Sequence, residues 1–169
     1  NKDGKYETDR RIELPTDNSE GECVIADLDM DGYPEVIFHE VTPLNDFISI
    51  YYGGPNGPKL DKCVKVPCNG YVFGILVADF NRDGFLDIVI CSGLYDDKPE
   101  SLAKSGAIYY GSKNGFSKSR SKVIESYSQS TVNASDINND GYLDLLFPEQ
   151  NDQVSIYMGS KKGYSKKNM

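Results

Sequence analysis

Three short segments of this chain carry acidic and amide side chains at the same alternating positions, a pattern that suits a hard metal cation. They begin at Asp27, Asp79 and Asp136, so consecutive copies start 52 and 57 residues apart. We number them loops one, two and three. Each has an oxygen-bearing side chain at positions 1, 3, 5 and 9 and glycine at position 6: Asp27, Asp29, Asp31, Gly32 and Glu35; Asp79, Asn81, Asp83, Gly84 and Asp87; Asp136, Asn138, Asp140, Gly141 and Asp144.

Alternate side chains of a tight loop can converge on one ion if the backbone turns sharply. Calcium takes six to eight oxygen ligands at about 2.3–2.6 Å, and the glycine at position 6 permits the turn. Position 7 would add a backbone carbonyl, because its aromatic side chain offers no strong oxygen ligand; these residues are Tyr33, Phe85 and Tyr142. The carboxylate at position 9 would close the shell. We therefore expect up to three Ca²⁺ ions.

Other readings of the loops fit less well. Magnesium demands octahedral geometry and retains its waters, and zinc prefers His and Cys, which the loops lack. A helix-flanked calcium hand needs glutamate at position 12, where this chain has Phe38, Ile90 and Phe147. A solvated acidic turn would explain any single copy, but three matched copies favour ion sites. Loop one carries four carboxylates against three in each other loop, so we expect it to bind most tightly.

Short β-branched runs flank the loops, so each loop is predicted to link two adjacent strands. Further along each repeat comes an aromatic strand that ends in glycine, at residues 50–53, 108–111 and 156–159. Glycine turns follow at residues 55–57, 113–115 and 161–163, and further strand candidates at 62–66 and 121–125. One unit thus has four short antiparallel strands, the size of one propeller blade. The predicted fold class is all-β, with three such units.

This combination of acidic loop, hydrophobic strands and Tyr-x-Gly resembles the FG-GAP/VCBS repeat family, whose best-known members form the integrin α-subunit β-propeller head. The resemblance covers almost the whole chain, and Phe73-Gly74 is the only trace of the Phe-Gly signature, so the VCBS variant fits better. It implies that the three loops hold calcium on one face of a disc. It also implies that the oxygen-bearing residues of the loops are the ligands.

The repeats set the expected boundaries. Residues 1–20 would be the last strand of a preceding blade, with the strand itself at 7–14; blade one spans 21–70, blade two 71–127 and blade three 128–169, whose last strand is incomplete. Propellers close with about four to eight blades. Two arrangements remain open: a partial propeller that continues in a longer chain, or a ring completed by head-to-tail copies, with 7–14 finishing a neighbour's third blade.

Composition narrows the function classes. The net charge of the 169 residues is −8, and ten of the 26 acids lie in the loops. Three calcium ions would bring the charge to about −2, so the acidity does not require a basic partner. No basic face with interleaved aromatics indicates nucleic acid, and no apolar run reaches the roughly 18 residues of a membrane span. Calcium sites together with cysteines favour an extracellular, periplasmic or cell-surface location.

Four cysteines allow three disulfide pairings: Cys23, Cys63, Cys68 and Cys91. Cys63 and Cys68 are close in sequence, and a turn at Pro67 and 69–70 would bring them together. The alternative is buried thiols on strands.

No catalytic constellation is recognisable, so we do not expect an enzyme. The only histidine, His39, is expected at the surface near a strand end, and no nucleophile elbow or phosphate loop occurs. The sequence favours a secreted interaction or adhesion module that binds protein or glycan through propeller loops. The alternative is a lectin-like domain or one associated with a carbohydrate-active enzyme. The insertion at 93–102 is the candidate partner-contacting loop.

Overall fold

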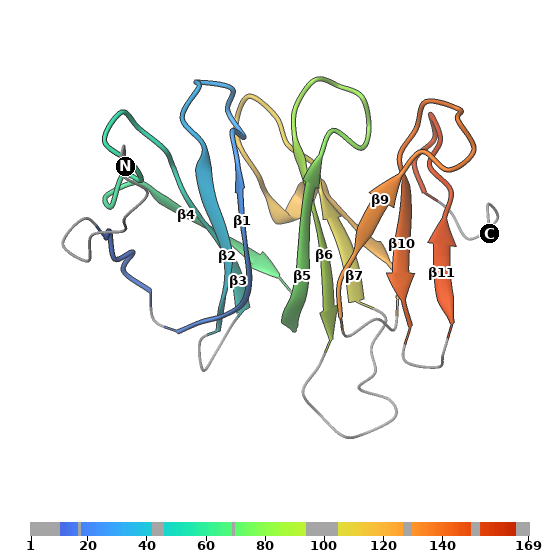
Figure 1. Cartoon of the computed structure of the whole chain (residues 1–169), viewed down its shortest axis with the longest axis horizontal. Helices are drawn as coiled ribbons and strands as arrows, with labels where there is room; N and C mark the ends of the chain where they lie inside the picture. Colours follow the sequence, from blue (N-terminus) through green and yellow to red (C-terminus); the bar gives the residue numbers. More distant parts are fainter. Residues whose placement is uncertain are drawn as a thin grey trace, which may run out of the picture.

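The computed structural model describes residues 11–16, 18–41, 46–68, 70–93, 105–126, 130–149 and 153–164. Eleven strands form three antiparallel sheets that stand side by side (Figure 1). The described part contains no α-helix, which confirms the all-β prediction. It accordingly offers no long apolar helix that could cross a membrane. Within these ranges the three sheets do not close into a ring.

Each sheet is built from consecutive strands. The first has the order β1-β2-β3-β4, from β1 (Ser19–Ala26), β2 (Glu35–Val41), β3 (Asp46–Tyr51) and β4 (Cys63–Cys68). The second has the order β5-β6-β7-β8, from β5 (Tyr71–Ala78), β6 (Asp87–Gly93), β7 (Ser105–Tyr109) and β8 (Ser121–Ile124). The third contains β9 (Asn133–Ser135), β10 (Asp144–Pro148) and β11 (Val154–Tyr157), in that order. A fourth strand here would fall on residues 165–169, outside the described ranges.

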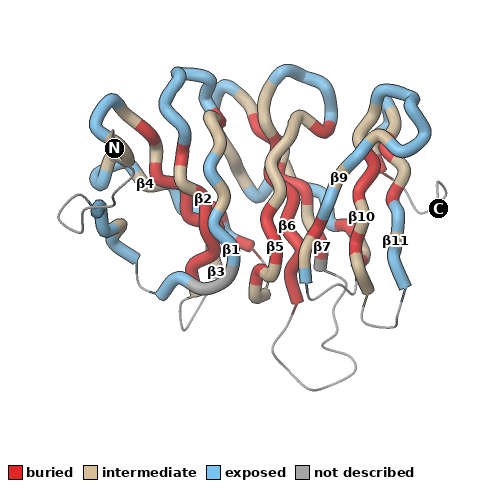
Figure 2. Tube along the Cα trace, viewed as in Figure 1, coloured by how far each residue is buried: buried red, intermediate tan, exposed pale blue. Residues whose placement is uncertain are grey.

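The core lies between the sheets because alternate residues of each strand point to opposite faces. Ile37 and Ile50 of the first sheet pack in one cluster with Ile88 and Ile90 of the second. The other face of the second sheet packs on the third, in a cluster that includes Val89, Ile108, Leu145 and Phe147. Strand β6 is therefore buried along its whole length, and Figure 2 shows buried residues concentrated along the middle strands.

In each sheet, one tyrosine hydroxyl donates a hydrogen bond to a backbone carbonyl of the chain segment that precedes that sheet. Tyr109 donates to the carbonyl of Pro67 at 3.2 Å, and Tyr157 donates to that of Glu125, so each reaches the end of the preceding sheet's last strand. Tyr51 donates in the same way to Pro15. The segment 11–16 therefore takes the place that a preceding sheet's last strand would occupy.

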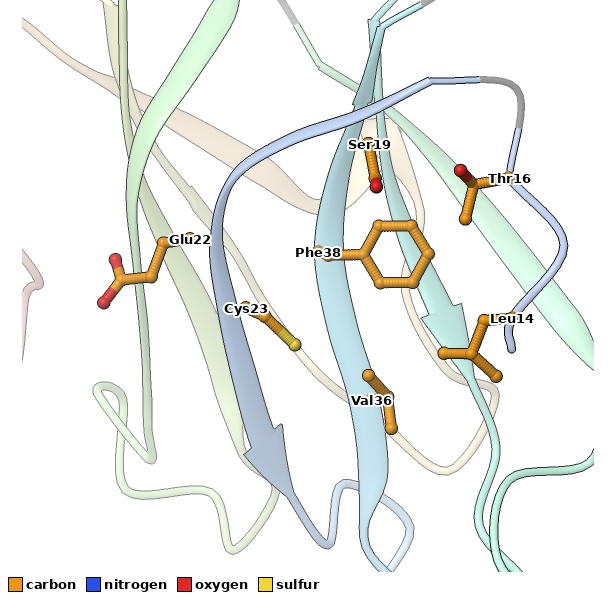
Figure 3. A pocket seen from close by; sticks show the side chains of 7 residues that line it. All are labelled: Leu14, Thr16, Ser19, Glu22, Cys23, Val36 and Phe38. Carbon is orange, nitrogen blue, oxygen red and sulfur yellow. The ribbon is translucent and has the colours of Figure 1, made fainter. Parts of the chain in front are cut away.

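Figure 3 shows Leu14 and Thr16 of this segment facing Phe38 and Val36 of β2 across a pocket of about 320 Å³. The predicted strand at 7–14 is nevertheless not formed at 11–14, where none of the described strands pairs with it. Residues 7–10 lie outside the described ranges.

Gly53, which follows the first aromatic strand, is expected not to tolerate a side chain. A Cβ there would collide with the backbone oxygens of Tyr33 and Pro34. A Cβ on the adjacent Gly54 would be crowded only by the flexible Lys59 side chain, at 2.8 Å, and would make an ordinary contact with the Gly57 carbonyl oxygen at 3.5 Å. We expect Gly53→Ala to lower the free energy of unfolding by about 3 kcal/mol, the upper range for overpacking, and Gly54→Ala by less than about 1 kcal/mol. Urea denaturation of both variants checks this, and equal losses would contradict the backbone clash.

The structure rules out the disulfide between Cys63 and Cys68. The two residues begin and end the same strand, β4, so their Cα atoms are about 16 Å apart at 3.3 Å per residue. A disulfide needs about 4.4–6.8 Å. No disulfide joins any of the four cysteines, all of which are described. The alternative of buried thiols holds for Cys68 and Cys91, while Cys23 is exposed.

The prediction of a surface-exposed His39 is also wrong. The strand β2 continues past it, and its side chain is completely buried on the face that meets the second sheet. Its Nδ1 accepts a long hydrogen bond from the Val72 N–H at 3.4 Å, and the ring packs edge-on against Tyr71. His39 is therefore part of the contact between the first two sheets.

Candidate metal centres

All three acidic loops lie at the same edge of the row of sheets, each between the first two strands of its sheet (Figure 1). Their internal hydrogen bonds are the same. The two carboxylate oxygens of position 1 accept the N–H groups of positions 5 and 6, at 3.1 and 3.0 Å for Asp27, 3.1 and 2.9 Å for Asp79, and 3.0 and 2.8 Å for Asp136. The position-1 carboxylate therefore shapes each loop from within.

The loops also share an unusual backbone. Position 4 has a positive φ in a residue with a side chain: 58° at Met30, 61° at Arg82 and 58° at Asn139. Such a conformation costs roughly 1–2 kcal/mol. The glycine at position 6 adopts 86–89° in all three loops. Three different residues accept the same strain, so the hydrogen bonds of the loop, rather than local preference, determine this conformation.

The carboxylate at position 9 is completely buried in every loop and has both oxygens bonded to the backbone. One oxygen accepts the N–H of position 2, and the other accepts the N–H of the glycine after the aromatic strand. The distances are 2.6 and 3.0 Å for Glu35, 2.9 and 2.9 Å for Asp87, and 2.9 and 2.7 Å for Asp144. This residue ties the loop to the aromatic strand, a role that the sequence did not predict.

Burial disfavours the ionised form of the Asp87 carboxyl. It raises the pKa of Asp87 to about 6; the Gly111 and Phe80 N–H groups lower the pKa, and the nearby charges of Asp83 and Asp79 raise it further. At neutral pH the Asp87 carboxylate is therefore ionised, although its burial makes the ionised form less stable than it would be in water. A cation bound in loop two would offset both the burial and the repulsion.

Loop one brings three carboxylates close enough together to share one metal ion. Single oxygens of Asp27, Asp29 and Glu35 lie within 4.8 Å of one another. Two ligands at 2.3–2.6 Å from one ion are at most about 5 Å apart. Each oxygen that accepts an N–H keeps a further lone pair for an ion. These oxygens of loop one could therefore hold a metal ion.

Loops two and three differ at position 3, where asparagine replaces aspartate. The Nδ2 group of Asn81 donates to the Asp83 carboxylate at 2.9 Å, and Asn138 donates likewise to Asp140 at 2.9 Å. The amide neutralises part of the repulsion inside these loops. Asp29 cannot donate in this way when ionised, so loop one has more uncompensated negative charge.

Exchanging the residue at position 3 is expected to exchange the affinities. Asp29→Asn removes one ligand charge and adds the amide donor, so we expect calcium binding by loop one to weaken about tenfold, because ligand charge tunes affinity. Conversely, Asn81→Asp adds a ligand charge and should increase the calcium affinity of loop two. Isothermal titration calorimetry of the two variants measures both changes. If Asp29→Asn left the tightest step unaltered, that step would not belong to loop one.

The structure also places the residues of position 7. The N–H groups of Tyr33, Phe85 and Tyr142 each donate to the position-5 carboxylate at 2.9 Å. The Arg82 guanidinium lies 5.3 Å from the Tyr142 ring centroid, which links loop two to loop three. All fifteen predicted site residues thus belong to three similarly built loops. The candidate partner-contacting loop at 93–102 lies outside the described residues beyond Gly93.

A buried charged group away from the loops was not anticipated. Glu40 is 1% exposed on β2; it accepts hydrogen bonds from Ser49 at 2.5 Å and from the Lys65 ammonium at 3.0 Å. Ser49 and Lys65 pair directly across β3 and β4, and Glu40 lies diagonally from Ser49 on β2, so the contact ties the three strands together. An acidic residue inside an apolar strand was the only sequence signal for it.

No protein-family model matches this chain, and no curated protein matches it at a significant level.

Proposed function

We propose that this chain is a calcium-binding β-propeller repeat module of the FG-GAP/VCBS type. In this proposal Asp27, Asp79, Asp136 and the other oxygen-bearing loop residues hold up to three Ca²⁺ ions. The observation that carries it is the common geometry of the loops, together with the cluster of carboxylate oxygens in loop one that suits one calcium ion. The role is binding rather than catalysis, in a secreted or surface protein.

Packing of the sheets supports a propeller with more blades than three. Ile50 and Ile108 are completely buried by the following sheet, whereas their counterpart Ile156 is 37% exposed on the outer face of the third sheet. The segment 11–16 occupies the place of a preceding last strand. Both observations suit further blades of a longer chain or a second copy placed head to tail.

The module is proposed to mediate adhesion or another interaction with protein or glycan. In this proposal, bound ions would hold the acidic loops rigid at one edge of the sheets. The connecting segments at that edge would then present their side chains to the partner in a fixed arrangement. A lectin-like or carbohydrate-enzyme-associated domain is the alternative, and it differs in the partner rather than in the calcium chemistry.

Calorimetric titration with calcium of the wild type and of Asp27→Ala, Asp79→Ala and Asp136→Ala tests the proposal. We expect about three equivalents in the wild type and the loss of one equivalent in each variant, since the position-1 carboxylate also shapes its loop. Asp61→Ala, an exposed aspartate outside the loops, should bind as the wild type does. Absence of calcium binding, or equal stoichiometry in all variants, would refute the proposal.

A further inference from the structure

Loops two and three present the same oxygen donors, so a difference in their cation affinity has to come from the surroundings of the loops. Both have aspartate at positions 1, 5 and 9 and asparagine at position 3. In both loops the position-1 carboxylate accepts the same two N–H groups, and the asparagine donates to the position-5 carboxylate. Within the loops themselves, nothing favours one site over the other.

The surroundings differ because a side chain of loop two lies over loop three. Arg82 is the exposed residue at position 4 of loop two, and its guanidinium carbon lies 5.3 Å from the Tyr142 ring centroid. A Cβ added to Gly141 would lie 3.0 Å from the Arg82 Nη1 atom, whereas a Cβ on Gly32 or Gly84 would meet nothing within 4 Å. Among the residues that the structure describes, only Arg82 lies this close to the glycine of any acidic loop.

The guanidinium charge is near the oxygens that would bind a cation in loop three. The Gly141 N–H donates to the Asp136 carboxylate at 2.8 Å. Standard bond lengths then place Nη1 at most about 8 Å from that carboxylate. Cation–π attraction to the Tyr142 ring favours this position, and an arginine is always charged. Loop three therefore has a permanent positive neighbour.

This positive charge opposes a second cation in loop three. Coulomb's law in water gives a single and a double charge roughly 8–10 Å apart a repulsion that lowers the binding constant about fourfold. The guanidinium also offsets part of the repulsion among the loop carboxylates when no ion is bound, so ion binding relieves less of it. Arg82 makes its ring contact with loop three rather than with its own loop, so the larger effect is expected there.

We propose that Arg82 makes loop three the weakest cation site of the three by acting as a tethered competitor. When the loop binds a divalent cation, the guanidinium either leaves the Tyr142 ring or remains against the repulsion, and both lower the affinity. The inference deepens the proposed function and rests on it, because it concerns how tightly one of the candidate calcium sites binds. Loop one, with four carboxylates, would then be tightest and loop two intermediate.

Calorimetric titration of the whole chain with calcium at low salt tests the inference. Arg82→Met introduces the residue that loop one has at the same position with the same positive φ, Met30, so the variant should fold. The weakest binding step, identified as the one that Asp136→Ala removes, should become about fourfold tighter in Arg82→Met. Arg11→Met removes the same charge from an exposed arginine outside the loops and should leave that step unchanged.

Two further measurements separate the charge effect from a change in loop structure. At 1 M salt the Debye length is about 3 Å, so the difference between the wild type and Arg82→Met should disappear. In a Tyr142→Leu background the ring no longer holds the guanidinium over loop three, and Arg82→Met should give a smaller gain in affinity.

The outcomes distinguish this inference from the proposed function. Calcium binding by all three loops with an unchanged weakest step in Arg82→Met would overturn the inference and leave the proposed function in place. A larger gain at the step that Asp79→Ala removes would show that Arg82 acts on its own loop, and it would also overturn the inference. The absence of any calcium binding by the wild type would refute the proposed function and the inference together.

Discussion

Calcium at one hundred times its dissociation constant is expected to raise the free energy of unfolding by about 8 kcal/mol. A ligand that binds only the folded state at this concentration contributes about 2.7 kcal/mol per site, and three loops are available. For a chain of this size, 1 kcal/mol shifts Tm by roughly 2–4 °C, so Tm should rise by about 20 °C. The physical reason is that a cation relieves the repulsion and burial cost of the clustered loop carboxylates. Scanning calorimetry with calcium and with chelator measures the shift.

Magnesium and a loop variant provide the controls for this shift. Magnesium retains its waters and its octahedral geometry, so the same concentration should raise Tm by much less. The triple variant Asp27→Ala, Asp79→Ala and Asp136→Ala should lose the calcium response. An unchanged Tm on chelation of the wild type would show that cation binding does not stabilise the fold.

Asp87→Ala is expected to cost about 4 kcal/mol of stability in the absence of calcium, the largest effect of any single carboxylate in loop two. The substitution leaves the buried N–H groups of Phe80 and Gly111 without their acceptor, and each unsatisfied group costs about 1–3 kcal/mol. It also disconnects loop two from the end of β7. Urea denaturation with chelator present, so that ion binding does not contribute, measures the loss.

Two comparisons separate this effect from a general loss of charge. Asp79→Ala also removes two backbone hydrogen bonds, but these are exposed, so water replaces them and the loss should be clearly smaller. The exposed control Asp61→Ala should remain within about 0.5 kcal/mol of the wild type. If Asp87→Ala were as mild as Asp79→Ala, the position-9 carboxylate would not connect the loop to the aromatic strand.

The acidic loops could be predicted from the sequence because their geometry is local. The position-1 carboxylate meets N–H groups only four and five residues away, and glycine at position 6 indicates the turn that brings them there. The short β-branched runs on either side indicated the two adjacent strands that each loop joins. Repetition made the local pattern reliable, since the structure forms the same loop from three different sequences.

The second role of position 9 could not be predicted, because its partner is distant in the chain. Glu35 accepts from Gly53, 18 residues away, and Asp87 accepts from Gly111, 24 residues away. The sequence showed both the carboxylate and the glycine repeating, but only the antiparallel pairing of strands brings them together. The same limit applies to His39, whose burial depends on Val72 and Tyr71 of the neighbouring sheet.

Strand pairing within the first sheet explains why the predicted disulfide was wrong. A turn between Cys63 and Cys68 was compatible with local propensity, yet pairing with β3 keeps the whole segment extended.

The central claim is that the three loops are calcium sites, and anomalous diffraction from crystals grown with calcium tests it most directly. Data collected at long wavelength should show an anomalous peak in each loop, about 2.3–2.6 Å from the oxygens of positions 1, 3 and 5. The strongest occupancy is expected in loop one, beside Asp27, Asp29 and Glu35. Loops without anomalous peaks at saturating calcium would contradict the claim.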